Sequence, residues 1–420
     1  MSDTEPRLYL IRCGGLADGR GGPLVRDAAV LVREGLIARA GPSAEVARDL
    51  PPGAETIELG DLCLIPGLVD AHTHTSLSGD GRSYAEQFSD SDELMVLIGA
   101  MNLRRHLNAG ITTIREHGAR NRVGFVIREG VRRGYIAGPR MLVSGRPVTC
   151  TRGHFHFCNE EADGDVEIRR SVRRLVHEGA DYIKIMASGG GTEGTDPGLP
   201  SYSTEELRAA VHEAHNFHRL TAAHCRAKES IRRAVEAGLD LIEHAEFLEP
   251  DGQTRFDPAL AAMMVEAGVW ISPTLQAFTR YAKILRLRES RDSETLSPRE
   301  ETELDRLERN AEKRLDIVRR MLDAGMRGRM VPGTDSGPND IAFGHIDYDL
   351  ELLVRAGLSP SEAMVAATKS SAEAIGLEKE IGTIEPGKVA DLAAVDGDPT
   401  ADVGAIGRVR AVFQAGARVR

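Results

Sequence analysis

The feature that most constrains the fold of this chain is a repeated alternation of short apolar runs and longer amphipathic segments between residues 67 and 376. The apolar runs have the length of β-strands. Many amphipathic segments end in Ala-Gly, which is typical of a helix that stops at a glycine and leads into the next strand. Such endings occur at residues 108–110, 236–238, 266–268 and 323–325. The alternation predicts parallel strands connected by helices.

Eight of the apolar runs are predicted to be strands of one sheet. They are Gly67–His74, Ile111–His117, Arg140–Ser144, Tyr182–Ala187, Leu220–Cys225, Leu241–Glu246, Trp270–Leu275 and Arg329–Thr334. Eight strands with intervening helices favour an α/β fold of the closed (β/α)8 TIM barrel type. An open doubly wound sheet usually carries a glycine-rich nucleotide turn after its first strand, and this chain has Asp70-Ala71-His72-Thr73-His74 there.

The two ends of the chain carry short β segments that cannot bury a core separately. They are Leu8–Arg12, Ala29–Arg33, Leu36–Ala40 and Thr56–Leu59 near the start, and Asp391–Val395 and Arg410–Gln414 near the end. We infer one small β-sandwich domain assembled from both termini. The predicted domains are therefore residues 1–66 and 377–420 for the sandwich and 67–376 for the barrel. Within the barrel, residues 279–320 are predicted to form a charged, solvated helical extension without a chemical signal.

Charge and composition argue against several kinds of partner. The chain has 64 acidic and 53 basic residues, a net charge of −11, whereas nucleic acids and anionic membranes bind basic surfaces. No leader pattern and no apolar stretch long enough to span a membrane is present, so neither export nor insertion is expected. The five scattered cysteines fit reduced thiols in the cytoplasm. We expect a cytoplasmic homo-oligomer that acts on a small molecule.

Potential metal ligands stand at or near the ends of the predicted strands, where barrel enzymes place their chemistry. They are His72, His74, Lys184, His224, His244 and Asp335. His72 and His74 are two residues apart, so both imidazoles point to the same side of their strand. Each histidine alone could be a hydrogen-bonded core residue, and Asp335 alone could be a turn residue. Their joint occurrence at one end of a barrel favours a metal site.

Lys184 lies inside a predicted buried strand, where an uncompensated ammonium group is costly. A salt bridge to a neighbouring carboxylate is one explanation. The other is that the amine has a lowered pKa and reacts with carbon dioxide to form a carbamate, an anion able to bridge two cations.

These residues and two longer motifs resemble the amidohydrolase superfamily. The motifs are Ile65-Pro66-Gly67-Leu68-Val69-Asp70-Ala71-His72-Thr73-His74 and the late run Gly382–Leu392, which reads Gly-Thr-Ile-Glu-Pro-Gly-Lys-Val-Ala-Asp-Leu. The resemblance covers essentially the whole chain. It is strongest to the imidazolonepropionase-like and prolidase-like branch, whose members include dipeptidases with a carboxylated lysine. Lys184 argues against imidazolonepropionase activity itself, because those enzymes resemble a mononuclear arrangement without this lysine.

The resemblance implies a binuclear centre of two divalent ions. One ion would be bound by His72, His74 and Asp335, and carboxylated Lys184 would bridge it to a second ion bound by His224 and His244. A donor set of imidazole nitrogens and carboxylate oxygens suits Zn²⁺ best, with Mn²⁺, Co²⁺ and Fe²⁺ as alternatives. A metal-bridging hydroxide would then attack an amide carbonyl, and Asp335 would pass a proton to the leaving amine.

Three further residues are predicted to contact the substrate. His154 corresponds to a histidine that touches the scissile carbonyl in related dipeptidases, although Arg152 replaces a glycine of that motif and His156 competes for the role. Arg226 could bind a terminal carboxylate, or it could be a surface residue of the following helix. Tyr202 is predicted to shape the pocket wall.

The predicted function is hydrolysis of the C–N bond of a dipeptide or an N-acyl amino acid. Hydrolysis of a cyclic amide or imide, deamination and a phosphotriesterase side activity remain alternatives within the superfamily. A non-catalytic scaffold is the alternative of a different class, and metal content would distinguish it.

Overall fold

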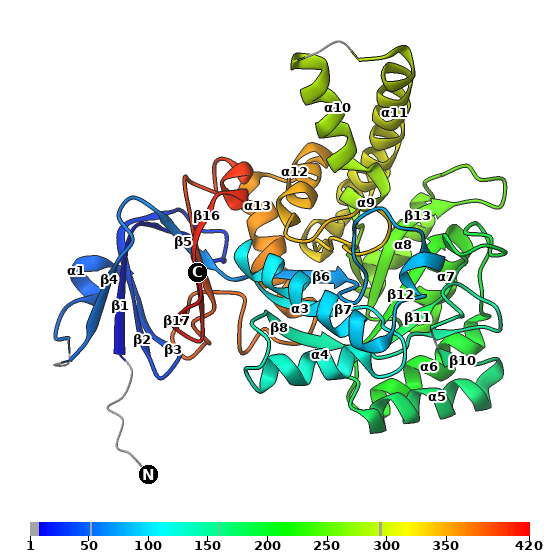
Figure 1. Cartoon of the computed structure of the whole chain (residues 1–420), viewed down its shortest axis with the longest axis horizontal. Helices are drawn as coiled ribbons and strands as arrows, with labels where there is room; N and C mark the ends of the chain where they lie inside the picture. Colours follow the sequence, from blue (N-terminus) through cyan, green and yellow to red (C-terminus); the bar gives the residue numbers. More distant parts are fainter. Residues whose placement is uncertain (1–7, 51–52, 159, 294–295) are drawn as a thin grey trace.

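The computed structural model describes residues 8–50, 53–158, 160–293 and 296–420, so the first seven residues of the predicted segment 1–66 lie outside the described part. Figure 1 shows a sheet at one end of the molecule, which contains both the first and the last strands of the chain, and a larger α/β body beside it. The chain leaves the sheet, runs through the body and returns.

The terminal sheet has eight strands in the order β17-β16-β15-β5-β1-β2-β3, with β4 paired to β1. Their bounds are β1 Leu8–Leu16, β2 Val25–Arg33, β3 Leu36–Pro42, β4 Glu55–Glu58, β5 Cys63–Pro66, β15 Leu392–Val395, β16 Val409–Gln414 and β17 Ala417–Arg418. Antiparallel pairing of β5 with β15 joins the two ends of the chain. Ile11, Leu64 and Phe413 share its apolar core. The strands form one sheet, so a sandwich of two separate layers stays a prediction.

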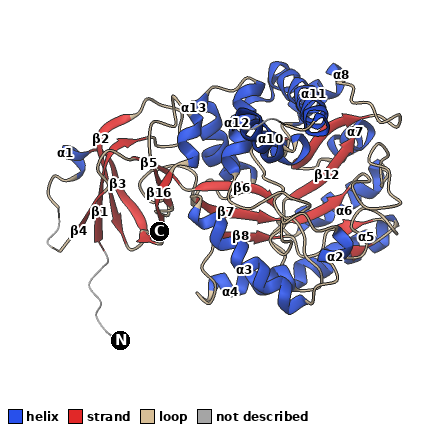
Figure 2. Cartoon of the chain, turned by 45° about the horizontal axis from the view of Figure 1, so that its top comes forward, coloured by secondary structure: helices blue, strands red, loops and turns tan. Residues whose placement is uncertain are grey.

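The body contains two parallel sheets, drawn in red in Figure 2. One has the order β6-β7-β8, and the other has the order β10-β9-β11-β12-β13-β14. Their bounds are β6 Leu68–Thr73, β7 Ile111–Glu116, β8 Arg140–Val143, β9 Val148–Thr149, β10 Glu160–Glu161, β11 Ile183–Met186, β12 Thr221–Ala227, β13 Leu241–Leu248 and β14 Trp270–Ser272. The amide of Asp181 donates to the carbonyl of Val143 at 2.9 Å across one boundary between the sheets. The sheets are not one closed ladder, so the barrel stays a prediction.

The last predicted strand, Arg329–Thr334, differs from the structure. Met330 makes only an isolated parallel bridge to Ile271 of β14. The carbonyl of Pro332 accepts from Ala71 of β6 at 3.2 Å, so the segment runs between β14 and β6 without becoming a regular strand. Proline has no N–H to donate, and Asp335 follows with a left-handed φ of 50°. Both features interrupt a regular ladder.

Helices cover the parallel sheets and follow their strands along the chain. Their bounds, after α1 Ser43–Val46 of the terminal sheet, are α2 Tyr84–Gln87, α3 Asp92–Asn108, α4 Val123–Arg132, α5 Gly164–Glu178, α6 Thr204–Asn216, α7 Lys228–Ala237, α8 Pro258–Ala267, α9 Leu275–Thr279, α10 Tyr281–Ser293, α11 Pro298–Met321, α12 Ile346–Ala356, α13 Pro360–Val365 and α14 Ser371–Ala374. Gly238 and Gly268 end α7 and α8 in the left-handed conformation, as the Ala-Gly pattern predicts.

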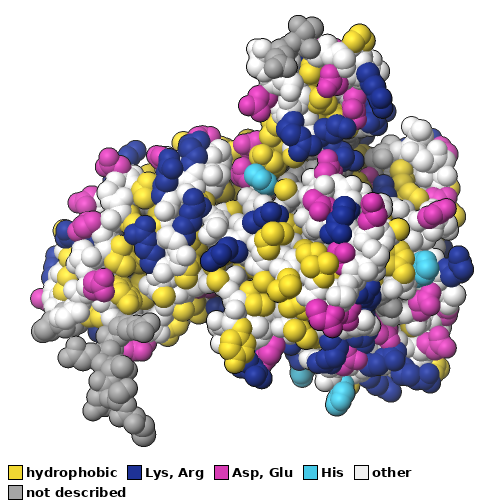
Figure 3. Space-filling model, viewed as in Figure 1, with side chains coloured by type: hydrophobic (Ala, Val, Ile, Leu, Met, Phe, Trp, Pro, Cys, Tyr) yellow, Lys and Arg dark blue, Asp and Glu magenta, His cyan; other side chains and the backbone are white. Residues whose placement is uncertain are grey.

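Helices α10 and α11 form the predicted extension and project from the top of the molecule in Figure 1. Ile284, Leu304 and Leu307 pack in a small apolar cluster between them. Figure 3 shows acidic and basic side chains interspersed over the face it presents. Among the described residues, no helix is long and apolar enough to cross a membrane. The five cysteines are all free.

Candidate active site

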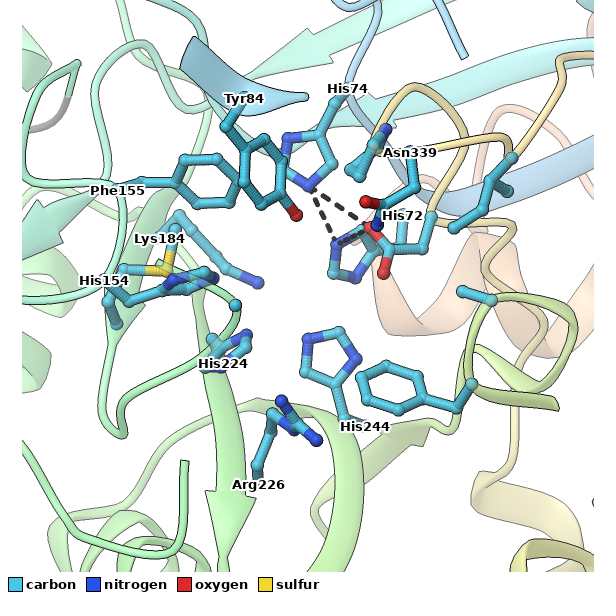
Figure 4. Close-up of a pocket in the computed structure, with 17 residues that line it drawn as sticks. His72, His74, Tyr84, His154, Phe155, Lys184, His224, Arg226, His244 and Asn339 are labelled. Atoms are coloured by element: carbon cyan, nitrogen blue, oxygen red, sulfur yellow. Dashed lines mark hydrogen bonds and ion pairs between the residues drawn. The ribbon is translucent and has the colours of Figure 1, made fainter. Parts of the chain in front are cut away.

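The six predicted metal ligands line one cavity of about 150 Å³. Strand β6 and the residue after it supply His72 and His74, and β11, β12 and β13 supply Lys184, His224 and His244, while Asp335 follows the Met330–Pro332 segment. Figure 4 shows the histidines and the lysine converging on a common space. The parallel strands bring these side chains together because their carboxyl ends meet at one edge.

His72, His74 and Asp335 form a closed triangle of donor atoms. The two Nε2 atoms lie 3.4 Å apart, and each lies 3.4 Å from Oδ1 of Asp335. The centre of such a triangle is about 2.0 Å from each corner, which is close to a Zn–N or Zn–O bond length. Although burial opposes it, the two imidazoles hold the pKa of Asp335 below its usual value. The triangle therefore fits a divalent cation.

His224 and His244 form a looser pair, with ring centroids 4.5 Å apart. Nε2 of His224 donates to the carbonyl of Gly189 at 3.0 Å, so the lone pair on its Nδ1 is left for a ligand. Nδ1 of His244 lies 2.8 Å from the Thr274 hydroxyl, which leaves Nε2. One ring nitrogen of His244 also lies within 4.8 Å of donor atoms of His72 and Asp335. Each imidazole of the pair thus keeps one nitrogen for a second cation.

Lys184 is 1% exposed, and its Nζ has no hydrogen-bond partner within the described ranges. Burial lowers the pKa of the amine to about 8, although Glu243 and Asp335 raise it. Among the described residues, no carboxylate forms a salt bridge with Lys184, so the first explanation for this buried lysine is not observed. A buried amine that has no partner and a pKa of about 8 is partly unprotonated near neutral pH, and the unprotonated amine can react with carbon dioxide.

Glu243 is a site residue that was not predicted from the sequence. Its Oε2 lies 2.8 Å from Nδ1 of His72, and its Oε1 lies 2.5 Å from Nε2 of His117. The carboxylate accepts a hydrogen bond from Nδ1–H of His72, which leaves Nε2 of that ring for a metal. The His117 ring is also hydrogen-bonded to the hydroxyl of Tyr182 through Nδ1. An acidic residue inside the apolar run Leu241-Ile242-Glu243 was the signal that could have revealed it.

His154 lines the cavity, and its ring centroid is 4.6 Å from that of His224. Its Nδ1 lies 2.9 Å from Oγ1 of Thr192. The ring sits so close to Gly190 that a Cβ there would approach it to 2.5 Å, so a side chain at this position would displace the ring. Burial lowers the pKa of His154 to about 3, so the ring is neutral. His156 is not among the residues that line this cavity.

Arg226 also lines the cavity, and Figure 4 places its guanidinium beside His224 and His244. Its Nε donates to the carboxylate of Glu246, and the guanidinium carbon lies 5.0 Å from the ring centroid of Phe278. Arg226 lies in β12 and faces the cavity, so it is not a surface residue of the following helix.

Tyr202 does not line the cavity, which corrects its predicted place in the pocket wall. Its hydroxyl donates to the carbonyl of Ala162 at 2.9 Å, and its ring belongs to the main apolar core. The residue directly precedes Ser203, the N-cap of α6, and turns inward with that helix. Tyr84 of α2 supplies a phenol to the wall instead, as Figure 4 shows. No motif around Tyr84 in the sequence indicates this position.

The parallel sheets and the cavity are those of an α/β enzyme with a centre of nitrogen and oxygen donors. The chain belongs to the amidohydrolase family, whose model matches residues 63–419. It is 27% identical to ochratoxinase from Aspergillus niger over 432 residues, covering 96% of this chain and 84% of that protein. It is 26% identical to imidazolonepropionase from Rhizorhabdus wittichii over 419 residues, covering 90% of each.

A solved structure of an Xaa-Pro dipeptidase with methionine bound in the active site is also similar. It has a TM-score of 0.82 and 25% identity and covers 98% of this chain and 100% of the dipeptidase. The family and these relatives support hydrolysis of carbon–nitrogen bonds as the general activity of this chain.

Proposed function

We propose that this chain is a binuclear metal-dependent amidohydrolase that cleaves the amide bond of a dipeptide or an N-acyl amino acid. The observation that carries the proposal is the convergence of six donor residues on one cavity, three of them in a triangle of metal-binding size. The similar dipeptidase, which holds an amino acid in its active site, supports the substrate class. The proposal includes a (β/α)8 barrel at residues 67–376 and a sandwich from residues 1–66 and 377–420.

The proposed centre uses the two groups of donors differently. His72, His74 and Asp335 would hold one ion, and His224 and His244 would hold the other. The Nζ of Lys184 would attack carbon dioxide, forming an N–C bond and releasing a proton, and the resulting carbamate would bridge the two ions. Zn²⁺ fits these donors best. Bound ions of this kind lower the pKa of water and polarise a carbonyl group.

The side chains around the centre have separate tasks in the proposed reaction. Asp335 keeps Oδ1 in the triangle, so its other oxygen accepts the proton of the attacking water and passes it to the leaving nitrogen. The backbone amide of Phe155 donates to Thr192 Oγ1 at 3.0 Å, so that hydroxyl can donate to Nδ1 of His154. The proton of the His154 ring then lies on Nε2, which donates to the carbonyl oxygen of the substrate. Arg226 binds the free carboxylate.

The test is metal analysis of the purified protein combined with a substrate screen. We expect about two divalent ions per chain, since two donor groups are present. The zinc- or manganese-loaded protein is then assayed against dipeptides and N-acyl amino acids with ninhydrin detection of the released amine. Hydrolysis that disappears with a chelator and returns with metal supports the proposal. A folded protein that binds no metal would instead be a scaffold, and release of ammonia alone would indicate a deaminase.

A further inference from the structure

The cavity that holds the donor residues is small for a whole substrate. Its volume of about 150 Å³ is below the range of roughly 300–1,000 Å³ that is usual for ligand pockets. A second cavity of about 1020 Å³ adjoins it, and Arg226 and Phe278 line both. We call the second cavity the outer groove. A substrate whose amide reaches the donor residues has room to extend past Arg226 into this groove.

The outer groove lies between the end of β13 and helix α11. Glu246 and Leu248 of β13 form one side, together with the turn closed by the bridge between Leu248 and Thr254. Residues 308–317 of α11 supply the other side. The projecting extension in Figure 1, which carries no chemical signal in the sequence, therefore forms a wall next to the active site.

The carboxylates that α11 contributes to the groove are already neutralised by arginines outside it. Glu308 pairs with Arg288 at 2.7 Å, and Glu312 pairs with Arg355 at 2.6 Å. Asp316 pairs with Arg320 at 2.9 Å. None of these three arginines lines the groove. These three carboxylates therefore repel a bound anion only weakly.

Two basic side chains of the groove, unlike its carboxylates, are not paired with a group of opposite charge among the described residues. Arg309 and Lys313 are exposed, lie one helical turn apart, and have no ion pair in the described part of the chain. Their charges are therefore available to a bound anion.

Arg314 adds a third, buried charge to the same wall. It is 6% exposed, and its guanidinium donates to the carbonyls of His244, Ala245 and Pro273, with no carboxylate in an ion pair among the described residues. Its Nε has no partner there. The neighbouring carboxylate of Glu246 is bonded to Arg226. Two guanidiniums thus stand near one carboxylate, and a buried charge without a counter-ion favours an anion nearby.

We propose that the outer groove is a substrate subsite for an anionic group, and that the preferred substrates are amides of acidic amino acids. The inference rests on the proposed amidohydrolase function and narrows its substrate class. One carboxylate of the substrate binds Arg226 beside the donor residues. The side-chain carboxylate passes Phe278 and lies in the groove near Arg309 and Lys313.

The experiment compares two substrates that differ only in charge, N-acetyl-glutamate and N-acetyl-glutamine, with the metal-loaded full chain. We expect kcat/KM to be about tenfold higher for the glutamate derivative, a difference of about 1.4 kcal/mol. The double variant R309E/K313E should lower the ratio to one or below, because repulsion replaces attraction. The control R299E/R306E changes two exposed arginines of α11 that do not line the groove, with the same change in net charge. It should keep the ratio.

A binding measurement separates this inference from the proposed function. Calorimetry on the same metal-loaded protein compares glutarate, with two carboxylates, with pentanoate, with one. We expect glutarate to bind about tenfold more tightly and to lose this advantage in R309E/K313E. Equal affinities, or an equal loss in the control, would overturn the subsite. If the protein hydrolyses neither these two amides nor any dipeptide or N-acyl amino acid of the screen, the proposed function fails, while the glutarate measurement still decides whether the groove binds an anion.

Discussion

The two groups of donor residues in the cavity are built differently. His72, His74 and Asp335 already stand at mutual distances of 3.4 Å. His224 and His244 have ring centroids 4.5 Å apart, and Lys184 between the groups has no partner in the described residues. One group is thus closed in shape, and the other is open.

The supports behind the two groups explain this difference. Behind the closed group, Oδ1 of Asp70 accepts from the backbone amides of His72 at 3.1 Å and Thr334 at 2.9 Å, which ties β6 to the segment that carries Asp335. Glu243 fixes the His72 ring. The open group is supported by neutral partners, Gly189 and Thr274. Charge-assisted hydrogen bonds are stronger than neutral ones, so we expect the closed group to bind the first ion and the open group to depend on a bridge from Lys184.

The largest effect is expected when the closed group loses its carboxylate. Asp335→Asn keeps the size of the side chain but removes both the anionic ligand and the proton acceptor, so kcat should fall about a thousandfold. Circular dichroism should show an unchanged fold. Asp305→Asn, on the exposed part of α11, is the control and should keep full turnover. Turnover near normal in Asp335→Asn would remove this residue from the mechanism.

The next largest effect is expected at the bridge between the groups. Lys184→Met keeps the approximate side-chain volume and removes the amine, so the metal content should fall from about two ions to about one, and kcat about a hundredfold. The melting temperature of the metal-free protein should not fall, because an unpartnered buried amine is replaced by an apolar group. Two firmly bound ions in the variant would show that the open group needs no bridge.

The same lysine predicts a pH dependence. Since only the neutral amine attacks carbon dioxide, and the pKa of Lys184 is lowered to about 8 by burial, carboxylation should decrease as the pH falls below 8. Intact mass measurement of metal-free protein in bicarbonate buffer at several pH values checks this. A carboxylated fraction that stays constant between pH 6 and pH 8 at a fixed carbon dioxide concentration would contradict it.

A smaller effect is expected from the support of the closed group. Glu243→Gln retains a hydrogen bond to His72 but loses the negative charge, and such a change behind a metal ligand costs about 10–100-fold in metal affinity. Competition with a chromogenic chelator measures it. Binding of the first ion should weaken, since His72 belongs to the closed group. Unchanged affinity would mean that Asp70 alone supports this group.

The sequence predicted those parts of the site that depend on strand period and strand ends. His72 and His74 followed from alternation, and His224 and His244 from apolar runs that end in imidazole. All four histidines line one cavity, and their role as metal ligands stays a prediction. The joining of the two ends of the chain also followed from local strand pattern, because neither end could bury its apolar face alone, but β5, the strand that pairs with β15, was not among the predicted segments.

Features that depend on contacts distant in sequence were not predictable in this way. Glu243 acts through His72, which is 171 positions away in the chain. Arg314 reaches the carbonyl of His244 from a helix that reads as an ordinary charged surface. Tyr202 was misplaced because the direction of a loop residue depends on the turn into α6, and Pro332 interrupted a strand that its apolar neighbours favoured. Periodicity describes which side of an element a residue faces, and these four cases depend on which element lies opposite.

The smallest effect is expected from the support of the open group, and it tests the comparison most directly. Thr274→Val removes the hydroxyl next to Nδ1 of His244, and the loss of one neutral hydrogen bond of about 1 kcal/mol should weaken the second ion about fivefold. Thr274→Ser keeps the hydroxyl and is the matched control. Both ions are titrated by calorimetry, so that each constant is assigned to its step. If Thr274→Val weakens binding as much as Glu243→Gln does, the charge of the support does not explain why one group is closed and the other open.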